Sequence, residues 1–152
     1  MLNEGNMSNE TGTLTYIDPS GKALDSAYYK VNGTKLGNVC EDMYIYDGKM
    51  YIISQNGAVN GGEGLLTIAD AKSLEKIEVY NDPSKTLYWP THVAVTGNNI
   101  YLRDNNGIYS LNASTKKLTY IQNTEGADIL PMKIIGNKVF AANGSKLMVI
   151  QD

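Results

Sequence analysis

The chain has 152 residues, the length of a single domain. Hydrophobic residues make up 42% of it, enough for a buried core and too many for a disordered chain. Its 13 Lys and Arg against 16 Asp and Glu give a net charge of −3, which argues against nucleic-acid binding because such proteins need a basic surface. One Cys and one His exclude an internal disulfide, a Cys-based zinc site and a multi-His metal site. No apolar run is long enough for a membrane-spanning helix.

Three short strands are predicted at the start of the chain. In the segment that begins at Gly12, the apolar residues Leu14 and Tyr16 alternate with Thr, the spacing of a strand with one buried face. The three predicted strands cover Met1 to Asn6, Gly12 to Asp18 and Ala27 to Val31.

Two complete repeats follow, over residues 43–81 and 91–123. Each opens with two apolar runs around a turn dipeptide, Asp47-Gly48 in the first repeat and Gly97-Asn98 in the second. These dipeptides predict hairpins because Gly, Asn and Asp tolerate the positive φ angles of tight turns. A third and a fourth strand follow each hairpin, beginning at Gly64 and Lys76, and at Gly107 and Leu118.

The last part of the chain contains a further hairpin, around Gly136-Asn137, and one more strand. It lacks an equivalent of the fourth strand of the complete repeats. Its predicted strands cover Met132 to Gly136, Val139 to Ala142 and Lys146 to Ile150.

Four-stranded units that recur every 40 to 50 residues or so (about one blade length) are typical of β-propellers. We therefore predict an all-β fold, a partial β-propeller of about three and a half antiparallel blades. A β-sandwich built from the same hairpins is the alternative. The chain is then a single domain, 1–152, with blade parts at 1–32, 42–82, 90–124 and 131–152.

Incomplete blades leave open edge strands, which are templates for pairing with another chain. We expect two copies to associate through these edges as a homodimer related by a two-fold axis. A fragment of a longer propeller and an open stack of sheets are the other possibilities.

Two stretches of the chain resemble the start of YncE-like or surface-layer-type β-propellers. They are Asn3-Glu4-Gly5-Asn6 followed by Gly12 to Asp18, and Asn32-Gly33 with Leu36-Gly37 running into Asp42. Members of this family are extracytoplasmic lipoproteins of gut anaerobes, and the chain is similar to their N-terminal half. The resemblance implies a location at the cell surface or in the periplasm, with a signal segment outside this sequence.

The same resemblance implies little about activity, because most members of the family have none assigned. Some are similar to surface proteins that capture corrinoids and pass them to an outer-membrane transporter. The resemblance therefore implies a small-molecule ligand, such as a corrinoid or a glycan, or an outer-membrane protein partner.

Candidate binding residues come from two places in the predicted blades. Asn3 and Glu4 lie at the end of a strand, where they either serve the local turn or face a ligand. Trp89 and His92 lie just before the innermost strand of the second complete repeat. There they suit a stacking platform with a titratable hydrogen-bonding partner, although Trp packing between blades is the alternative.

Arg103 and Asp104 join two strands of the same repeat. We expect them to form a solvated pair, unless both lie at the mouth of the central channel and contact a ligand. Cys40 is expected to be a small buried hydrophobe because the chain has no catalytic-triad signature around it.

The predicted function is a non-catalytic binding or scaffolding module of the cell surface. No catalytic residue, metal ligand or cofactor is assigned, because no convergent acid–base pair or metal-ligand spacing is present. The alternatives are a propeller enzyme of the hydrolase or quinoprotein kind and a purely structural module.

Overall fold

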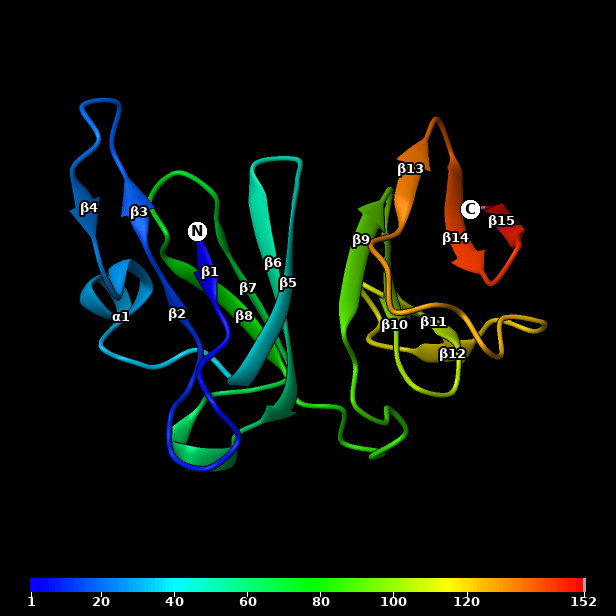
Figure 1. The fold of residues 1–152 in the computed structure, drawn as a ribbon, viewed down its shortest axis with the longest axis horizontal. Helices are drawn as coiled ribbons and strands as arrows, with labels where there is room; N and C mark the ends of the chain where they lie inside the picture. The colour runs from blue at the N-terminus through cyan, green and yellow to red at the C-terminus, as the bar shows by residue number, and fades with distance from the viewer. Residues whose placement is uncertain (152) are drawn as a thin grey trace. The chain divides into compact units, whose positions relative to one another are not determined.

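The computed structural model describes residues 1–151, which form short antiparallel sheets, one short α-helix and one 3-10 turn (Figure 1). Two of the sheets have four strands each, and smaller sheets accompany them at the two ends of the sequence. The all-β prediction is confirmed, and these sheets are consistent with a partial propeller. The chain divides into two compact units, and the boundary in the sequence lies between Ser84 and Lys85.

The first unit contains two two-stranded sheets and one four-stranded sheet with the order β5-β6-β7-β8. Strand β1 pairs with β2, and β3 pairs with β4. The elements of this unit are β1 (Leu2–Asn3), β2 (Thr13–Leu14), β3 (Tyr16–Ile17), β4 (Ala23–Leu24), α1 (Ala27–Asn32), β5 (Asn38–Tyr46), β6 (Lys49–Gly57), η1 (Val59–Gly61), β7 (Leu66–Asp70) and β8 (Lys76–Tyr80).

The second unit contains a four-stranded sheet with the order β12-β11-β10-β9 and a three-stranded sheet with the order β13-β14-β15. Its elements are β9 (His92–Thr96), β10 (Asn99–Arg103), β11 (Ile108–Asn112), β12 (Leu118–Tyr120), β13 (Lys133–Ile135), β14 (Lys138–Asn143) and β15 (Lys146–Gln151).

The predicted hairpin turns are present. Asp47 and Gly48 have φ angles of 48° and 71°, so both central residues of the β5–β6 turn adopt the left-handed conformation that a tight hairpin requires. Tyr44 and Tyr51 are paired across this hairpin. The Gly97-Asn98 turn likewise joins β9 to β10, where Ala94 pairs with Tyr101.

The strand predicted from Ala27 to Val31 is wrong, because this segment is the helix α1. Its Tyr and Val residues favour strands intrinsically, but tertiary contacts decide the conformation. Gly33 ends the helix with a φ of 67°, and its N–H donates to the Tyr29 carbonyl. The Asn32 side chain donates to the carbonyls of Tyr28 and Leu74, which ties the helix to the turn between β7 and β8.

The single strand predicted from Gly12 to Asp18 is also interrupted, at Thr15. Before this residue Leu14 pairs with Leu2, and after it Tyr16 pairs with Leu24. The Thr15 hydroxyl donates to Asp25 and accepts a hydrogen bond from the Asn3 side chain. The strand therefore changes partners at Thr15 instead of continuing through it.

Burial within the second four-stranded sheet falls from one side to the other. Residues Val93 to Val95 of β9 and Ile100 to Arg103 of β10 are all buried, so both faces of these two strands are covered. Strand β12 contains no buried residue. This gradient is the one expected for inner and outer strands of a blade.

Candidate functional site

An exposed aromatic pair precedes β9. The rings of Tyr88 and Trp89 stack with their centroids 5.6 Å apart and their planes 20° apart. Tyr88 is 54% exposed and Trp89 is 44% exposed, so Trp89 is not a core residue. Adjacent, nearly parallel rings on the surface are suited to stacking against a flat ligand.

The backbone of this pair is held in a costly conformation. Trp89 has a φ of 52°, in the left-handed region that bulky residues rarely adopt. Hydrogen bonds fix both sides of it: the Tyr88 N–H donates to Asp104 Oδ2 at 2.8 Å, and the Thr91 N–H donates to the Arg103 carbonyl at 2.9 Å. The strand ends that carry Arg103 and Asp104 therefore determine where the aromatic pair lies.

Asp104 is fully buried and organises the turn that follows β10. Its Oδ1 atom accepts hydrogen bonds from the backbone N–H groups of Asn106 and Gly107, at 2.8 and 3.0 Å. The same carboxylate holds Tyr88 through its second oxygen. One side chain thus connects the β10–β11 turn to the aromatic pair.

Arg103 is buried as well, with 6% of its surface exposed. Its Nε and Nη2 atoms donate to the carbonyl of Ala127 at 3.1 and 2.8 Å, and Nη1 donates to the Thr91 hydroxyl at 3.1 Å. Burial lowers the pKa of the guanidinium, and the carboxylates of Asp104 and Asp128 oppose this effect. The prediction of a solvated Arg103–Asp104 pair is wrong, because both residues are buried and the Arg103 donors are satisfied by the Ala127 carbonyl and the side chains of Thr91 and Asn105.

His92 begins β9 and is paired with Arg103 across the β9–β10 ladder. Its Nδ1 atom lies 2.9 Å from the Thr91 hydroxyl, which also accepts the hydrogen bond from Arg103. The structure therefore brings His92, Arg103 and Asp104 together around the segment that carries Trp89.

Asn3 and Glu4 belong to the first unit. The Asn3 side chain donates to the hydroxyls of Thr13 and Thr15, both at 3.0 Å, and it lines an open hollow of about 560 Å³ with Glu10 among its neighbours. The Glu4 carbonyl accepts the N–H of Cys40 at 3.0 Å, while its side chain is exposed. The bonds of Asn3 serve the local sheet.

Sequence reasoning missed Tyr88, which forms half of the aromatic surface. The adjacent Tyr-Trp dipeptide ahead of a strand was the available signal. The Ala127 carbonyl was also missed, since no local pattern indicates that a backbone oxygen 24 positions away receives the Arg103 fork.

The remaining ionisable groups show no metal centre. Among residues 1–151, no group of three or more His, Cys, Asp and Glu side chains is arranged to bind a metal ion. No helix in this range is long and apolar enough to span a bilayer.

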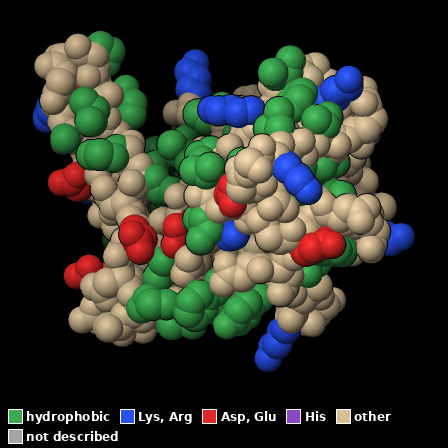
Figure 2. Space-filling model, turned by 45° about the vertical axis from the view of Figure 1, so that its right-hand side comes forward, with side chains coloured by type: hydrophobic (Ala, Val, Ile, Leu, Met, Phe, Trp, Pro, Cys, Tyr) green, Lys and Arg blue, Asp and Glu red, His purple; other side chains and the backbone are tan. Residues whose placement is uncertain are grey.

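Cys40 is buried as predicted, and burial raises the pKa of its thiol to about 12. On the face drawn in Figure 2, basic side chains are scattered singly among hydrophobic, acidic and other polar ones.

Comparison with protein families gives a match over the whole chain, residues 1–152, to the family described as Domain of unknown function (DUF5074). The chain belongs to this family. No curated protein matches it.

Solved structures resemble the chain in fold. The computationally designed Ika4 protein matches with a TM-score of 0.51 and 11% identity, over 75% of this chain and 66% of that protein. The computationally designed Ika8 protein matches with a TM-score of 0.50 and 12% identity, over 76% of this chain and 34% of that protein.

A third structure is the extracellular domain of a candidate one-component system from B. thetaiotaomicron. It has a TM-score of 0.48 and 12% identity, over 97% of this chain and 21% of that domain. The chain spans less than two thirds of each of these proteins.

Proposed function

We propose that this DUF5074 chain is a non-catalytic binding module whose ligand stacks on Tyr88 and Trp89. The observation that carries the proposal is the exposed, strained conformation of Trp89 (φ 52°), held in place by buried Arg103 and Asp104. Strain of this kind persists only when surrounding contacts impose it, and it is concentrated at functional sites. A buried polar network, Arg103 and Asp104, thus holds an exposed aromatic ring, Trp89, and this arrangement supports a binding role.

The ligand class follows from the shape and chemistry of the pair. Stacked aromatic rings favour a flat apolar face, and His92, three residues after Trp89, carries an imidazole that can exchange hydrogen bonds. A small molecule such as a corrinoid or a glycan has both features. We further propose that the protein is a lipoprotein of the cell surface or the periplasm, which the resemblance of its N-terminal motifs to YncE-like surface propellers supports.

The test is binding of cyanocobalamin and of a panel of neutral oligosaccharides by isothermal titration calorimetry. For any probe that binds, Trp89→Ala is expected to weaken binding at least about tenfold, because base- or sugar-sized stacking on an aromatic ring contributes roughly 1–3 kcal/mol. Trp89→Phe, which keeps an aromatic face, is expected to retain most of the affinity.

Thermal unfolding provides the control. Because Trp89 is exposed and its backbone is strained, Trp89→Gly is expected to unfold at the wild-type temperature or slightly above it. A large loss of stability in Trp89→Gly together with unchanged probe binding would show that Trp89 is structural. Absence of binding by every probe would contradict the proposed ligand class.

A further inference from the structure

A second candidate site lies entirely within the first unit. A partly open cavity of about 300 Å³ is lined by residues of β2, β3, β4, α1, the β5–β6 hairpin and the turn after β7. Its inner wall includes Leu14, Ala27 and Met50, which are 4%, 1% and 6% exposed. This wall is part of the hydrophobic core of the unit, because Leu14 and Met50 both belong to the main core cluster.

The outer wall is also apolar but remains in contact with water. Leu24 of β4 is 44% exposed and Val31 of α1 is 47% exposed, and both line the cavity. Tyr16, another lining residue, is 51% exposed. Apolar surface left open beside a cavity is typical of a site that a ligand completes.

The cavity exists because the first sheets are interrupted. The strand changes partners at Thr15, and residues 27–32 form α1 instead of the predicted strand. The helix contributes Ala27 to the cavity lining, together with Lys30 and Val31, which lie one helical turn further along. The same feature that departs from the predicted blade therefore creates the hollow.

The charge of the lining is one-sided. Lys30 and Lys72 are among the lining residues, and no Asp or Glu is, although the chain as a whole has a net charge of −3. Within residues 1–151 neither lysine forms an ion pair, but the charge of Lys72 is one of the causes that lower the pKa of Asp70, which lies outside the lining. Asp25, just after β4, accepts a hydrogen bond from the lining residue Thr15 but does not itself line the cavity.

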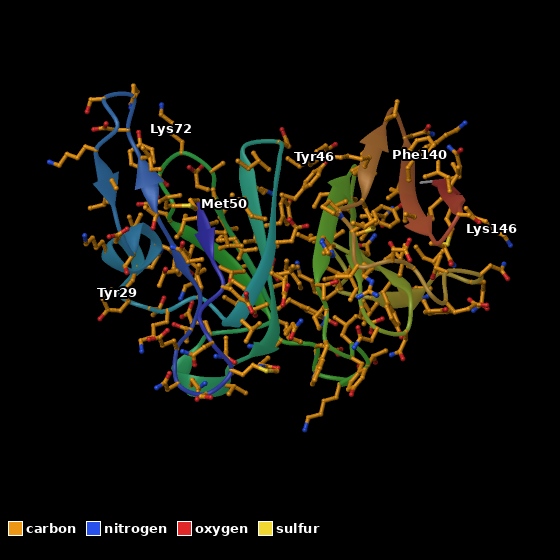
Figure 3. All side chains as sticks on the ribbon, in the orientation of Figure 1. Tyr29, Tyr46, Met50, Lys72, Phe140 and Lys146 are labelled. Carbon is orange, nitrogen blue, oxygen red and sulfur yellow. The ribbon has the colours of Figure 1, made fainter. Side chains whose placement is uncertain are left out.

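Figure 3 shows how the apolar and charged ends are arranged. Met50, a residue of β6, lies inward near β1, whereas Lys72 extends from the turn that follows β7. The Ser73 side chain lines the cavity next to Lys72. The hollow thus has an apolar interior and ammonium groups at its solvent-exposed residues, Lys30 and Lys72.

We propose that this cavity binds the acyl chain of a medium-chain fatty acid, with the carboxylate held by Lys30 and Lys72. The volume is at the lower end of the range for small-ligand sites, about 300–1,000 Å³, which favours a single short chain over a phospholipid. Two lysines and no Asp or Glu in the lining favour an anionic head group over a neutral or cationic one.

The test is calorimetric titration of the whole chain with decanoate, decanol and decyltrimethylammonium, each below its critical micelle concentration or solubility limit. Decanoate is expected to bind about tenfold more tightly than decanol, and decyltrimethylammonium is expected to bind more weakly than decanol. The double variant Lys30→Ala/Lys72→Ala is expected to lose this preference while its affinity for decanol stays unchanged. Lys49→Ala, which removes an exposed lysine outside the cavity, is the matched control and should bind decanoate as the wild type does.

A second pair of variants separates the site from general stability. Val31→Glu places a negative charge at an exposed position of the lining and is expected to abolish decanoate binding, whereas Val31→Lys should keep it. Circular dichroism establishes that both variants are folded. The proposal is overturned if decanoate does not bind, if decanol binds equally well, or if Val31→Glu binds decanoate normally.

Discussion

At the residue scale, Arg103 shows how a charged side chain becomes part of a core. All three of its side-chain nitrogens donate hydrogen bonds within the protein: Nε and Nη2 to the Ala127 carbonyl, and Nη1 to the Thr91 hydroxyl. Burial of a guanidinium is tolerated only when its donors are paired, because an unpaired buried charge costs several kcal/mol. The fork geometry of Arg, with two nitrogens on one carbonyl oxygen, is what the Ala127 contact uses.

We predict that Arg103→Ala lowers the free energy of unfolding by about 3 kcal/mol, because it leaves the Ala127 carbonyl without its donors and opens a cavity. Arg103→Lys keeps the charge but cannot reproduce the fork, and should lose about half as much. Urea unfolding monitored by tryptophan fluorescence measures both. A loss below about 1 kcal/mol for the Ala variant would show that the residue is solvated after all.

Cys40 is the second residue whose environment has a measurable consequence. Its Sγ atom lies 3.4 Å from the Gly37 carbonyl, and burial raises the pKa of the thiol from 9.0 to about 12, with the nearby Glu41 carboxylate as a smaller cause. A raised pKa means that the folded state holds the proton more tightly than the unfolded state. Stability from this group is therefore complete below pH 9 and decreases as the pH rises from 9 toward 12.

We predict that between pH 8 and pH 10 the free energy of unfolding of the wild type falls by about 1 kcal/mol more than that of Cys40→Ala. The comparison uses the change with pH, so the constant cost of removing the thiol cancels. Urea unfolding at a series of pH values provides the measurement. Parallel pH profiles for the two proteins would mean that Cys40 ionises in the folded state as it does in water.

At the element scale, two glycines that follow α1 have different roles. Gly33 ends the helix in the left-handed conformation, with open space where a Cβ atom would lie. Gly37 has no positive φ, but a Cβ atom there would lie 2.0 Å from Ser54 Oγ and 2.3 Å from the Gly64 carbonyl oxygen. Conformation requires glycine at position 33, and close approach of neighbouring segments requires it at position 37.

We predict that Gly37→Ala lowers the free energy of unfolding by about 3 kcal/mol, since the Gly64 backbone cannot move aside without disturbing β6 and β7. Gly33→Ala, the matched control, should cost only about 1 kcal/mol because its strain is confined to one residue. Urea unfolding of the two variants side by side tests the order. Equal losses of unfolding free energy in the two variants would contradict the conclusion that, of these two glycines, only Gly37 is closely packed.

At the scale of the whole molecule, the sheets differ in how many strands they hold. Among residues 1–151, the sheets β5–β8 and β9–β12 have four strands each, whereas β13-β14-β15 has three. In this part of the chain, β15 pairs only with β14, and its Leu147 and Val149 side chains are 65% and 54% exposed. An apolar strand with one free edge is a template for another strand.

We predict that the chain associates as a homodimer through this edge, giving a solution mass near twice 16.6 kDa by light scattering coupled to size exclusion. Val149→Lys is expected to lower the mass to that of one chain, because a charge on an edge strand opposes pairing. Ile77→Lys alters an equally exposed residue of β8, at the edge of a four-stranded sheet, and should leave the mass unchanged. A wild-type mass of one chain would contradict the prediction.

Most of the fold was readable from local patterns. Alternation of apolar residues and the Asp47-Gly48 and Gly97-Asn98 turns predicted the hairpins because pleat and turn geometry depend only on neighbouring residues. The repeat of these patterns predicted the four-stranded sheets. The position of Trp89 just ahead of β9, and the burial of Cys40, followed from the same reasoning.

Tertiary structure alone decided the features on which the sites depend. Ala27 to Val31 form a helix although Tyr and Val favour strands, and the Asn32 side chain ties this helix to the Leu74 carbonyl, 42 positions away. The burial of Arg103 likewise depends on a carbonyl 24 positions further along. Local sequence determines which backbone conformations are low in free energy. Long-range partners for buried polar groups determine which of these the protein adopts, because leaving a buried polar group unpaired costs more free energy than an unfavourable propensity.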